Sequence, residues 1–538
     1  MFRHRASGVI AISMLAVALG SCGGGGGGGL GGGTPPIGGS GYVRGRFDAS
    51  TLFEARCAAP RTGTDPTSGR PWPDQLGTAL DEKNWLRSWT HELYLWYREA
   101  PDLDPAGYAV LDYFDALKTS AVTASGQPKD RFHFTIPTDE WLDLSQSGAS
   151  ASYGAQWAVL SSTPPRDVRV AYIEPGASSP AAMAGLARGA RVFAIDGIDV
   201  VNTNVQADID RLNDAMSPLA AGESHSFTVQ DAGSSSQRTV SMTSANVTST
   251  PVQNVRTIAT ASGPVGYLLF NDHIATSEAG LVDAITTLRD AGVVDLVLDV
   301  RYNGGGFLDI ASELAFMIAG SARTNGRTFE LLQFNDQHPT RDPVTGETLA
   351  PIPFHSTAEG FSVVAGTPLP TLGLGRVYVL TGAGTCSASE SIMNSLRGID
   401  VEVIQVGSTT CGKPYGFYPT DNCGTTYFSI QFRGVNAKQF GDYPDGFSPA
   451  NTAGTMGVSV PGCSVADDFA HALGDPAEGR LAAALNYRAT GGQCGVPPSG
   501  VAAKAGAAGE AGAAAGALPL GEPRVPKSPW LENRILRR

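Results

Sequence analysis

The segment that decides the fold is GRVYVLTGAGTCSASESIMNSLRG, residues 375–398. Its first six residues form an apolar run typical of a buried strand, and Ile392, Leu396 and Ile399 recur at the spacing of one helix face. The sequence therefore predicts a strand that turns directly into a helix. Small polar residues fill the turn: Thr385, Ser387, Ser389 and Ser391. Such a turn either caps the helix or holds a nucleophile at its amino end.

The same alternation extends on both sides of this segment. From about Pro251 to Cys494, apolar runs such as VGYLLFND, VVDLVLDV and VEVIQVG alternate with helical patterns such as LVDAITTLRDAG and LDIASELAFMIAG. This rhythm predicts an open α/β sheet with crossover helices. Because ligands bind such sheets at the carboxyl ends of the strands, we expect the loops that follow the strands to form the site.

Two further loops of this region could meet the serine turn. Gly304–Gly306 follow a buried strand, and glycine triplets let backbone N–H groups face an anion. Lys413 follows the strand VEVIQVG, 26 residues after Ser387, so one helix and one strand return it to the same sheet edge. A lysine is usually a solvated surface charge, but one buried beside a serine has its pKa lowered and can act as a neutral base.

Together, DVRYNGGG, GTCSASE and TTCGK resemble the motifs of the C-terminal processing peptidases, in the family's order. The resemblance implies a crotonase-like α/β core and serine-protease chemistry with a Ser/Lys dyad. It assigns Ser387 as nucleophile, Lys413 as base and Glu390 as the glutamate that supports the site. It also implies an oxyanion hole of the backbone N–H groups of Gly305 and Ala388. We expect no cofactor and no metal, because the sequence lacks the CxxC-like spacing with histidines that a structural zinc site needs.

Two departures from the family pattern concern Lys413. Some family members carry an aspartate further down the helix after the nucleophile, but the matching stretch here, LRG, is followed by no acid until Asp400. Phe417 stands where the family often has a glutamine. The orientation of Lys413 is therefore left unexplained, unless a Cys386–Cys411 disulfide links the two loops. His273, in FNDHIATSE, is an alternative base or a simple capping residue.

Six cysteines besides Cys22 allow up to three disulfides, with 15 connectivities. The spacing favours Cys411–Cys423 and Cys57–Cys494, and Cys386–Cys411 competes with the first of these pairs.

Residues 168–200, with their EPGASSP turn, Ala-rich helix and VFAIDG strand, resemble the core of bacterial PDZ domains. Ala190 replaces the usual acidic residue of that pattern. The resemblance implies that a glycine-containing loop binds a peptide carboxyl terminus and adds it to a sheet edge. That loop would consist of Tyr153, Gly154, Ala155 and Gln156. A β-rich domain without a peptide role is the alternative.

The amino terminus has a basic start, an apolar stretch and the sequence LGSC, which resembles a lipobox. We therefore expect a signal peptide, lipidation of Cys22, and residence in the cell envelope of a Gram-negative bacterium, attached to the membrane only through lipid. The alternative is cleavage without lipidation. The formal net charge of −13, without a basic stripe, argues against nucleic-acid binding.

We expect a multidomain α/β chain, α+β overall, with a helical region whose Trp85, Trp89, Leu93 and Trp96 share one face. The expected divisions are a signal peptide (1–21), a Gly-rich tether (22–45), a helical domain (46–148), a PDZ-like domain (149–248), the α/β core (249–495) and a low-complexity tail (496–538). We expect the Ala/Gly-rich part of this tail to be disordered, and the sequence leaves open whether the final stretch, SPWLENRILRR, folds back on the enzyme, binds a partner or is simply a tail. The expected function is an envelope serine endopeptidase that processes protein C-termini, with protein or peptide substrates. The alternatives are a catalytically silent peptide- or ligand-binding protein of the same fold, and a scaffold that binds partner tails.

Overall fold

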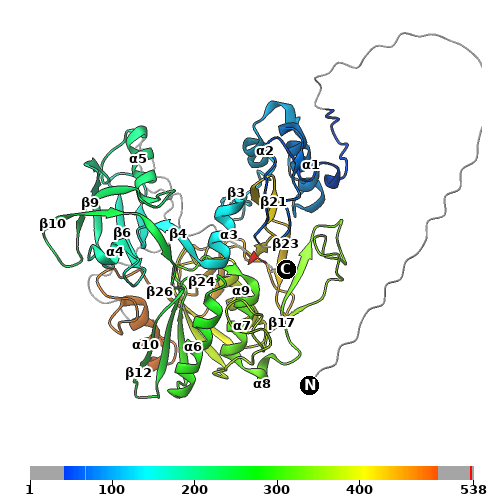
Figure 1. Ribbon diagram of the computed structural model, residues 1–538. Helices are drawn as coiled ribbons and strands as arrows, with labels where there is room; N and C mark the ends of the chain where they lie inside the picture. Colours follow the sequence, from blue (N-terminus) through cyan, green and yellow to red (C-terminus); the bar gives the residue numbers. More distant parts are fainter. Residues whose placement is uncertain (1–40, 67, 495–533, 536–538) are drawn as a thin grey trace, which may run out of the picture. The chain divides into compact units, whose positions relative to one another are not determined.

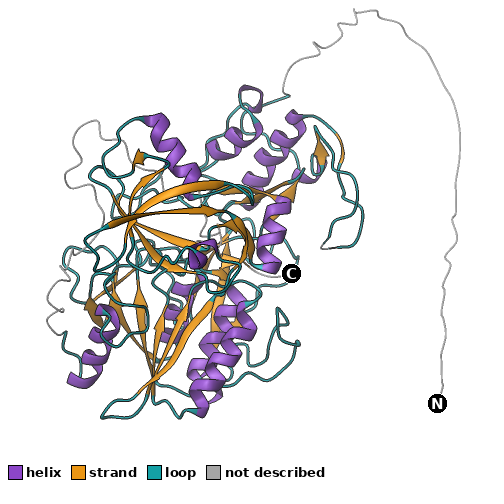
Figure 2. Ribbon diagram, turned by 60° about the vertical axis from the view of Figure 1, so that its left-hand side comes forward, coloured by secondary structure: helices purple, strands orange, loops and turns teal. Residues whose placement is uncertain are grey.

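The computed structural model describes residues 41–66, 68–494 and 534–535. Its central sheet has six strands in the order β12–β13–β14–β18–β19–β26, and only β12 runs antiparallel to its neighbour. Figures 1 and 2 show this sheet with helices beside it. The strands are Val252–Ile258 (β12), Val265–Phe270 (β13), Asp295–Asp299 (β14), Arg376–Thr381 (β18), Glu402–Gly407 (β19) and Gly462–Ser464 (β26).

The apolar runs of the sequence form strands because both faces of this sheet are buried. On β18, Val377 and Val379 face one hydrophobic cluster, whereas Tyr378 and Leu380 face another. A strand covered on both faces needs apolar residues at every position rather than at alternate ones. The open α/β sheet predicted from the sequence is confirmed.

Helices cover the two faces unequally. The first cluster includes residues of α6 (Ser277–Asp290), α7 (Leu308–Ala319) and α9 (Ala388–Gly398), and the second includes residues of α10 (Gly479–Thr490). In Figure 1, α6, α7 and α9 lie together, and α10 lies apart from them. The parallel strands end at one edge, where the loops after β14, β18 and β19 come together.

A second six-stranded sheet has the order β10–β9–β7–β6–β5, with β8 paired to β7, and it packs its own cluster around Trp157, Val192 and Phe227. The strands β4 and β11 pair at the entrance and exit of this region. The elements are β4 (Ala149–Ser152), β5 (Ala155–Ser161), β6 (Asp167–Ile173), α4 (Pro180–Met183), β7 (Arg191–Ile195), β8 (Ile198–Asp199), α5 (Gln206–Met216), β9 (Ser224–Gln230), β10 (Gln237–Thr243) and β11 (Ala245–Thr248).

The first helix, α1 (Ala79–Leu93), begins at a capping box in which Thr78 and Asp81 exchange hydrogen bonds. It ends at Leu93, so the prediction that Trp96 lies on its face is wrong. Trp85 and Trp89 pack with Tyr427 of the α/β region, so this aromatic cluster is shared between the two regions. The remaining elements here are η1 (Ser50–Leu52), β1 (Arg56–Cys57), β2 (Gln75–Leu76), η2 (Pro105–Gly107), α2 (Val110–Ala116), β3 (Phe134–Pro137) and α3 (Thr138–Ser147).

Smaller sheets flank the central one. Their orders are β17–β16–β23–β20, β21–β22–β3, β24–β25 and β15–β27. The elements are β15 (Gly306–Phe307), α8 (Ser321–Thr324), β16 (Thr328–Phe334), β17 (Ile352–Pro353), β20 (Tyr415–Gly416), β21 (Thr420–Asn422), β22 (Thr425–Phe428), β23 (Phe432–Val435), β24 (Phe447–Pro449), β25 (Val458–Val460) and β27 (Arg534–Ile535). The last of these lies in SPWLENRILRR, a stretch whose structure the sequence leaves open.

Three disulfides join Cys57 to Cys423, Cys386 to Cys411, and Cys463 to Cys494. The Cys386–Cys411 pair is confirmed. The pairings Cys411–Cys423 and Cys57–Cys494 are wrong, because the fold brings β1 beside the turn between β21 and β22 and leaves Cys494 next to β26.

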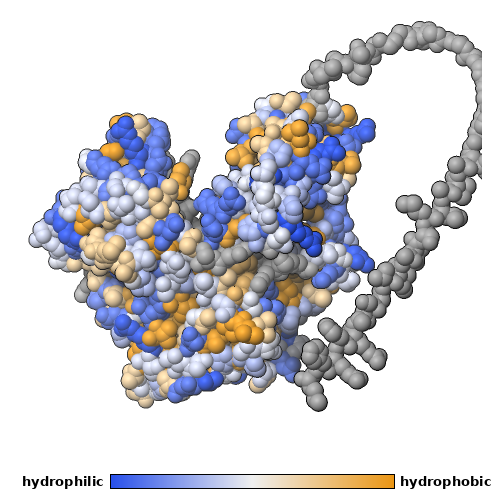
Figure 3. Space-filling view, in the orientation of Figure 1, coloured by the Kyte–Doolittle hydropathy of each residue, from blue (hydrophilic) through white to orange (hydrophobic). Residues whose placement is uncertain are grey.

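The signal peptide, Cys22 and most of the tether lie outside the described residues. Within the described part of the chain, no helix is both long and apolar enough to cross a membrane. On the face shown in Figure 3, hydrophobic and hydrophilic residues are interspersed.

Candidate active site

Ser387 lies at the junction of β18 and α9, in a backbone conformation that side chains rarely adopt. Its φ is 56°, and it directly precedes the first residue of the helix. The side chain is fully buried, and its Oγ has no hydrogen-bond partner among the described residues. A strained turn that holds an unpartnered hydroxyl at a helix amino end is typical of functional sites.

The glycine triplet lies directly against this turn. A Cβ on Gly305, whose φ is 106°, would lie 2.8 Å from Ser387 Cβ and 2.9 Å from Ala388 N. Only glycine permits both this φ and this contact. The structure thus brings Ser387, Ala388 and Gly305 together.

Glu390 joins the serine turn to the loop that contains Lys413. Its fully buried carboxylate accepts hydrogen bonds from Ser387 N (3.0 Å), Thr410 Oγ1 (2.5 Å), Gly412 N (2.9 Å) and Lys413 N (2.8 Å). Burial raises the pKa of Glu390, and these donors oppose the rise. Because Ser387 N and Lys413 N share one carboxylate oxygen, Glu390 fixes the two backbones close together.

Lys413 is fully buried between aromatic rings. Its Nζ lies 4.8 Å from the ring centre of Phe132 and 4.5 Å from that of Phe417. Phe417, which replaces the glutamine of the family pattern, therefore forms one wall around the amine. Phe132 comes from a distant part of the chain, and no motif in the sequence pointed to it.

The Cys386–Cys411 disulfide fastens the two loops together. The bond joins the residue before Ser387 to a residue two positions before Lys413, and Cys411 N donates to Thr385 O (2.9 Å). Both sulfurs lie near Glu390, but sulfurs bonded to each other offer no thiolate to a metal.

Asn303 connects the glycine turn with the serine turn, although the sequence analysis assigned it no role of its own. Its backbone O accepts from Cys386 N (3.1 Å), while its Oδ1 accepts from Gly305 N (2.9 Å). Its Nδ2 donates to Phe270 O (3.0 Å). The N–H of Gly305 is therefore directed at Asn303 in this arrangement and not into a vacant position beside Ser387.

His273 is hydrogen-bonded to Asn303. Its Nδ1 is 3.0 Å from Asn303 Oδ1, which is an acceptor, so Nδ1 is assigned the proton and Nε2 is left as an acceptor. Burial lowers the pKa of His273 to about 3, so the ring is neutral at ordinary pH. In this structure the ring of His273 positions the side chain of Asn303 through this hydrogen bond.

The loop predicted to bind peptides lies in the second sheet, apart from this cluster. Tyr153 is buried against Phe227, and Gly154 has a φ of 71°. Ala155 and Gln156 begin β5, which is an end strand of its sheet within the described residues. The outer edge of β5 is thus open to another strand in this part of the chain.

An ionic network connects that second sheet to the strand before the glycine turn. Arg188, which follows α4, donates to Tyr302 Oη (2.6 Å) and Asp467 Oδ1 (2.6 Å), and Arg301 donates to the same Asp467 oxygen (2.7 Å). Tyr302 is next to Asn303 in the chain. Burial alone would raise the pKa of Asp467, but the arginines hold it far below its usual range.

Two buried carboxyl groups hold the segment that packs against β15. Glu278 accepts from Ser362 N and Val363 N (both 2.6 Å), and Glu313 accepts from Glu359 N (2.8 Å). Burial, with Glu278 nearby, raises the pKa of Glu313 to about 9, so its carboxyl is protonated at neutral pH. The ring of Phe361 lies 4.8 Å from that of Phe307 in β15.

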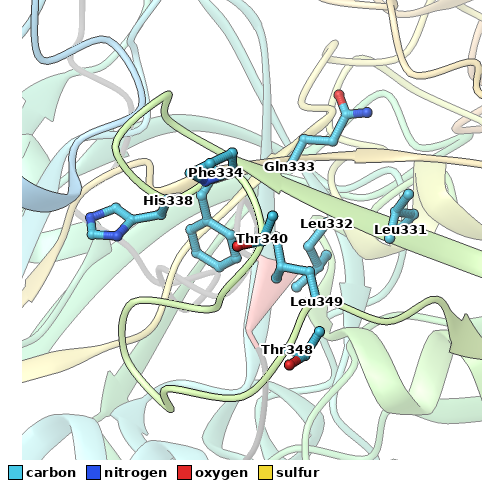
Figure 4. A pocket seen from close by; sticks show the side chains of 9 residues that line it. Leu331, Leu332, Gln333, Phe334, His338, Thr340, Thr348 and Leu349 are labelled. Carbon is cyan, nitrogen blue, oxygen red and sulfur yellow. The ribbon is translucent and has the colours of Figure 1, made fainter.

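A cavity of about 530 Å³ lies along β16, and its lining does not include Ser387, Glu390 or Lys413. Figure 4 shows Leu332, Phe334 and Leu349 near its centre and His338 at one side. Its lining consists of Leu331, Leu332, Gln333, Phe334, His338, Pro339, Thr340, Thr348 and Leu349. None of these is a predicted site residue.

Comparison with known proteins gives consistent results. Residues 264–416 match peptidase family S41. The chain is 29% identical over 174 residues to a carboxyl-terminal-processing protease of Picosynechococcus sp., covering 32% of this chain and 40% of the relative. It is 27% identical over 297 residues to a chloroplastic C-terminal processing peptidase of Tetradesmus obliquus, covering 51% of this chain and 56% of the relative. The chain thus spans about half the length of the curated relatives it matches.

A solved S41 protease of Bacteroides fragilis aligns with a TM-score of 0.56 at 22% identity, covering 78% of this chain and 99% of that one. At this identity the likeness shows the fold alone.

Proposed function

We propose that this chain, which belongs to peptidase family S41 through its residues 264–416, is a serine endopeptidase that cleaves peptide bonds with a Ser387/Lys413 dyad. The observation that supports this best is the shared carboxylate of Glu390, which fixes the backbones of both residues. The unpartnered Oγ of Ser387, held in a strained turn, gives independent support.

The mechanism is acyl transfer. The neutral amine of Lys413 takes the proton of Ser387 Oγ, and the oxygen attacks the scissile carbonyl carbon. The backbone N–H groups of Ala388 and Gly305 then donate to the oxyanion, an effect worth about 10²–10³ in rate per donor. Lys413 passes its proton to the leaving amine, and it activates the water that releases the acyl group. For Gly305 to donate, its N–H must first leave Asn303 Oδ1.

We also propose that residues 149–248 form a PDZ-like module. A substrate carboxyl terminus would bind at Tyr153–Gln156 and extend along β5, whose outer edge is unpaired in the described structure. Lipidation of Cys22 and residence in the cell envelope belong to the same proposal, and they rest on the sequence of the amino terminus.

The test is cleavage of casein by the chain from residue 23 onward, compared with Ser387→Ala and Lys413→Ala. Ser395→Ala, which removes another buried hydroxyl on α9, is the matched control. We expect both site variants to lose turnover with melting temperatures close to the parent, while the control keeps it. Turnover that survives Lys413→Ala would show that another residue is the base. A chain that binds casein peptides without cleaving them would favour the silent binding protein.

A further inference from the structure

A two-residue strand from the end of the chain is paired beside the catalytic cluster. β27 runs parallel to β15, with Arg534 opposite Gly306 and Ile535 opposite Phe307. β27 also contacts β20. Figure 1 shows it as a red arrow near the end of the chain.

The two strands that contact β27 follow the two loops of the proposed site. β15 begins directly after Gly305, the residue in contact with Ser387 and Ala388. β20 begins two residues after Lys413. A peptide segment at β27 therefore lies between the strand after the oxyanion glycine and the strand after the base. An extended substrate would have to pair along β15 to bring a carbonyl group to Ser387.

The rest of the site has the features of a closed state. Ser387 and Lys413 have no exposed surface, so no substrate can reach them without a rearrangement. The N–H of Gly305 is occupied by Asn303. Phe307, whose backbone pairs with that of Ile535, also contacts Phe361, and the Glu278–Glu313 pair fixes the segment of Phe361.

We propose that β27, Arg534–Ile535, occupies the substrate strand position on β15 and inhibits the enzyme in cis. The inference rests on the proposed function, which makes the surroundings of Ser387 the substrate site. The pairing of β27 with β15 identifies the segment that occupies this site. A substrate must displace β27 before it can pair with β15.

The size of the effect follows from tethering. Covalent attachment gives a segment a local concentration on the order of 1 mM. If the segment, as a free peptide, binds with a Kd of about 0.1 mM, the tethered segment would occupy the site in about ten of every eleven enzyme molecules. Its removal should therefore raise kcat/KM about tenfold. The same peptide added in trans at about 1 mM should restore the inhibition.

The test compares three forms of the chain from residue 23 onward: the full length, a form that ends at Glu532, and the double variant Arg534→Pro/Ile535→Pro. Proline removes the backbone N–H groups that a strand needs for pairing. The matched control is Ala513→Pro/Ala514→Pro, which places two prolines elsewhere in the same tail. Intact mass shows whether each sample keeps its tail.

We expect the truncated form and the strand variant to cleave casein about tenfold faster than the full length and the control. Equal rates in all forms would overturn the inference and leave the proposed function standing. Loss of the tail in the full-length enzyme but not in Ser387→Ala would make the tail a substrate, which also overturns inhibition.

A binding measurement separates the inference from the proposed function. A labelled peptide of residues 528–538 is titrated in the Ser387→Ala background, into the full-length and the truncated chain, and its anisotropy is followed. Binding to the truncated chain with at least tenfold weaker binding to the full length supports the cis occupant, even if no form cleaves casein. Equal binding to both forms, or binding to neither, contradicts it.

Discussion

Replacing Gly305 with alanine should lower turnover strongly while leaving the fold in place. The added Cβ would lie 2.8 Å from Ser387 Cβ, so the two must separate by about 0.6 Å to reach an ordinary contact of 3.4 Å. Ala388 N, only 2.9 Å from the same Cβ, must move as well. Because misplacement of reacting groups by about 1 Å can cost 10²-fold, and loss of one oxyanion donor 10²–10³-fold, we expect kcat/KM to fall at least about 10²-fold.

Gly222→Ala is the control that isolates backbone strain. Gly222 has a φ of 100°, close to the 106° of Gly305, but a Cβ there would have no neighbour within 4 Å. Both variants should lose about 1–3 kcal/mol of unfolding free energy from the unfavourable φ. Only Gly305→Ala should also lose activity. If its kcat/KM on casein stayed within about threefold of the parent, the proposed contact between the glycine turn and the nucleophile would be refuted.

Two further predictions concern the stability of the site. Removing the Cys386–Cys411 bond by a double alanine substitution should cost about 3 kcal/mol in urea unfolding and most of the activity, because it frees the loop that contains Lys413. The same change at Cys463 and Cys494, which close a loop of similar length, should cost about as much stability but keep the activity. The pKa of Glu313, about 9, lies above its ordinary value of 4.5. The protonated carboxyl of Glu313 therefore contributes its full stability to the fold when the pH is below 4.5, and this contribution is lost as the pH rises toward 9. Glu313→Gln, which carries no charge at any pH, should therefore gain stability over the parent by up to about 1.4 kcal/mol per pH unit across that window, and parallel pH dependences would argue against a protonated Glu313.

The sequence predicted the central sheet well because its strands are buried on both faces and end in glycine or small polar residues. The strand, turn and helix at 375–398 could be predicted for the same reason. A run of consecutive apolar residues is followed there by apolar residues at helical spacing. The end of α1 at Leu93, before Trp96, could not be predicted, because the spacing of the aromatic residues does not encode the loop conformation that follows.

Contacts between distant segments could not be predicted. Cys57 and Cys423 are 366 residues apart, and only the packing of the first helical region on β22 brings them together. The ring of Phe132 beside Lys413 and the pairing of β27 with β15 have the same origin. The role of Asn303 was hidden because its hydrogen bonds depend on the exact fold of the glycine turn.

The most direct test of the central claim is covalent labelling of the nucleophile by a fluorophosphonate, read out by peptide mass spectrometry. The chain is used with and without residues 533–538, alongside Lys413→Met and the matched Lys438→Met, which makes the same change at an exposed lysine. The account predicts a single adduct on Ser387 in the parent and in Lys438→Met, and none in Lys413→Met under the same conditions. An adduct on another serine, or equal labelling of Ser387 in Lys413→Met, would contradict a Ser387/Lys413 dyad.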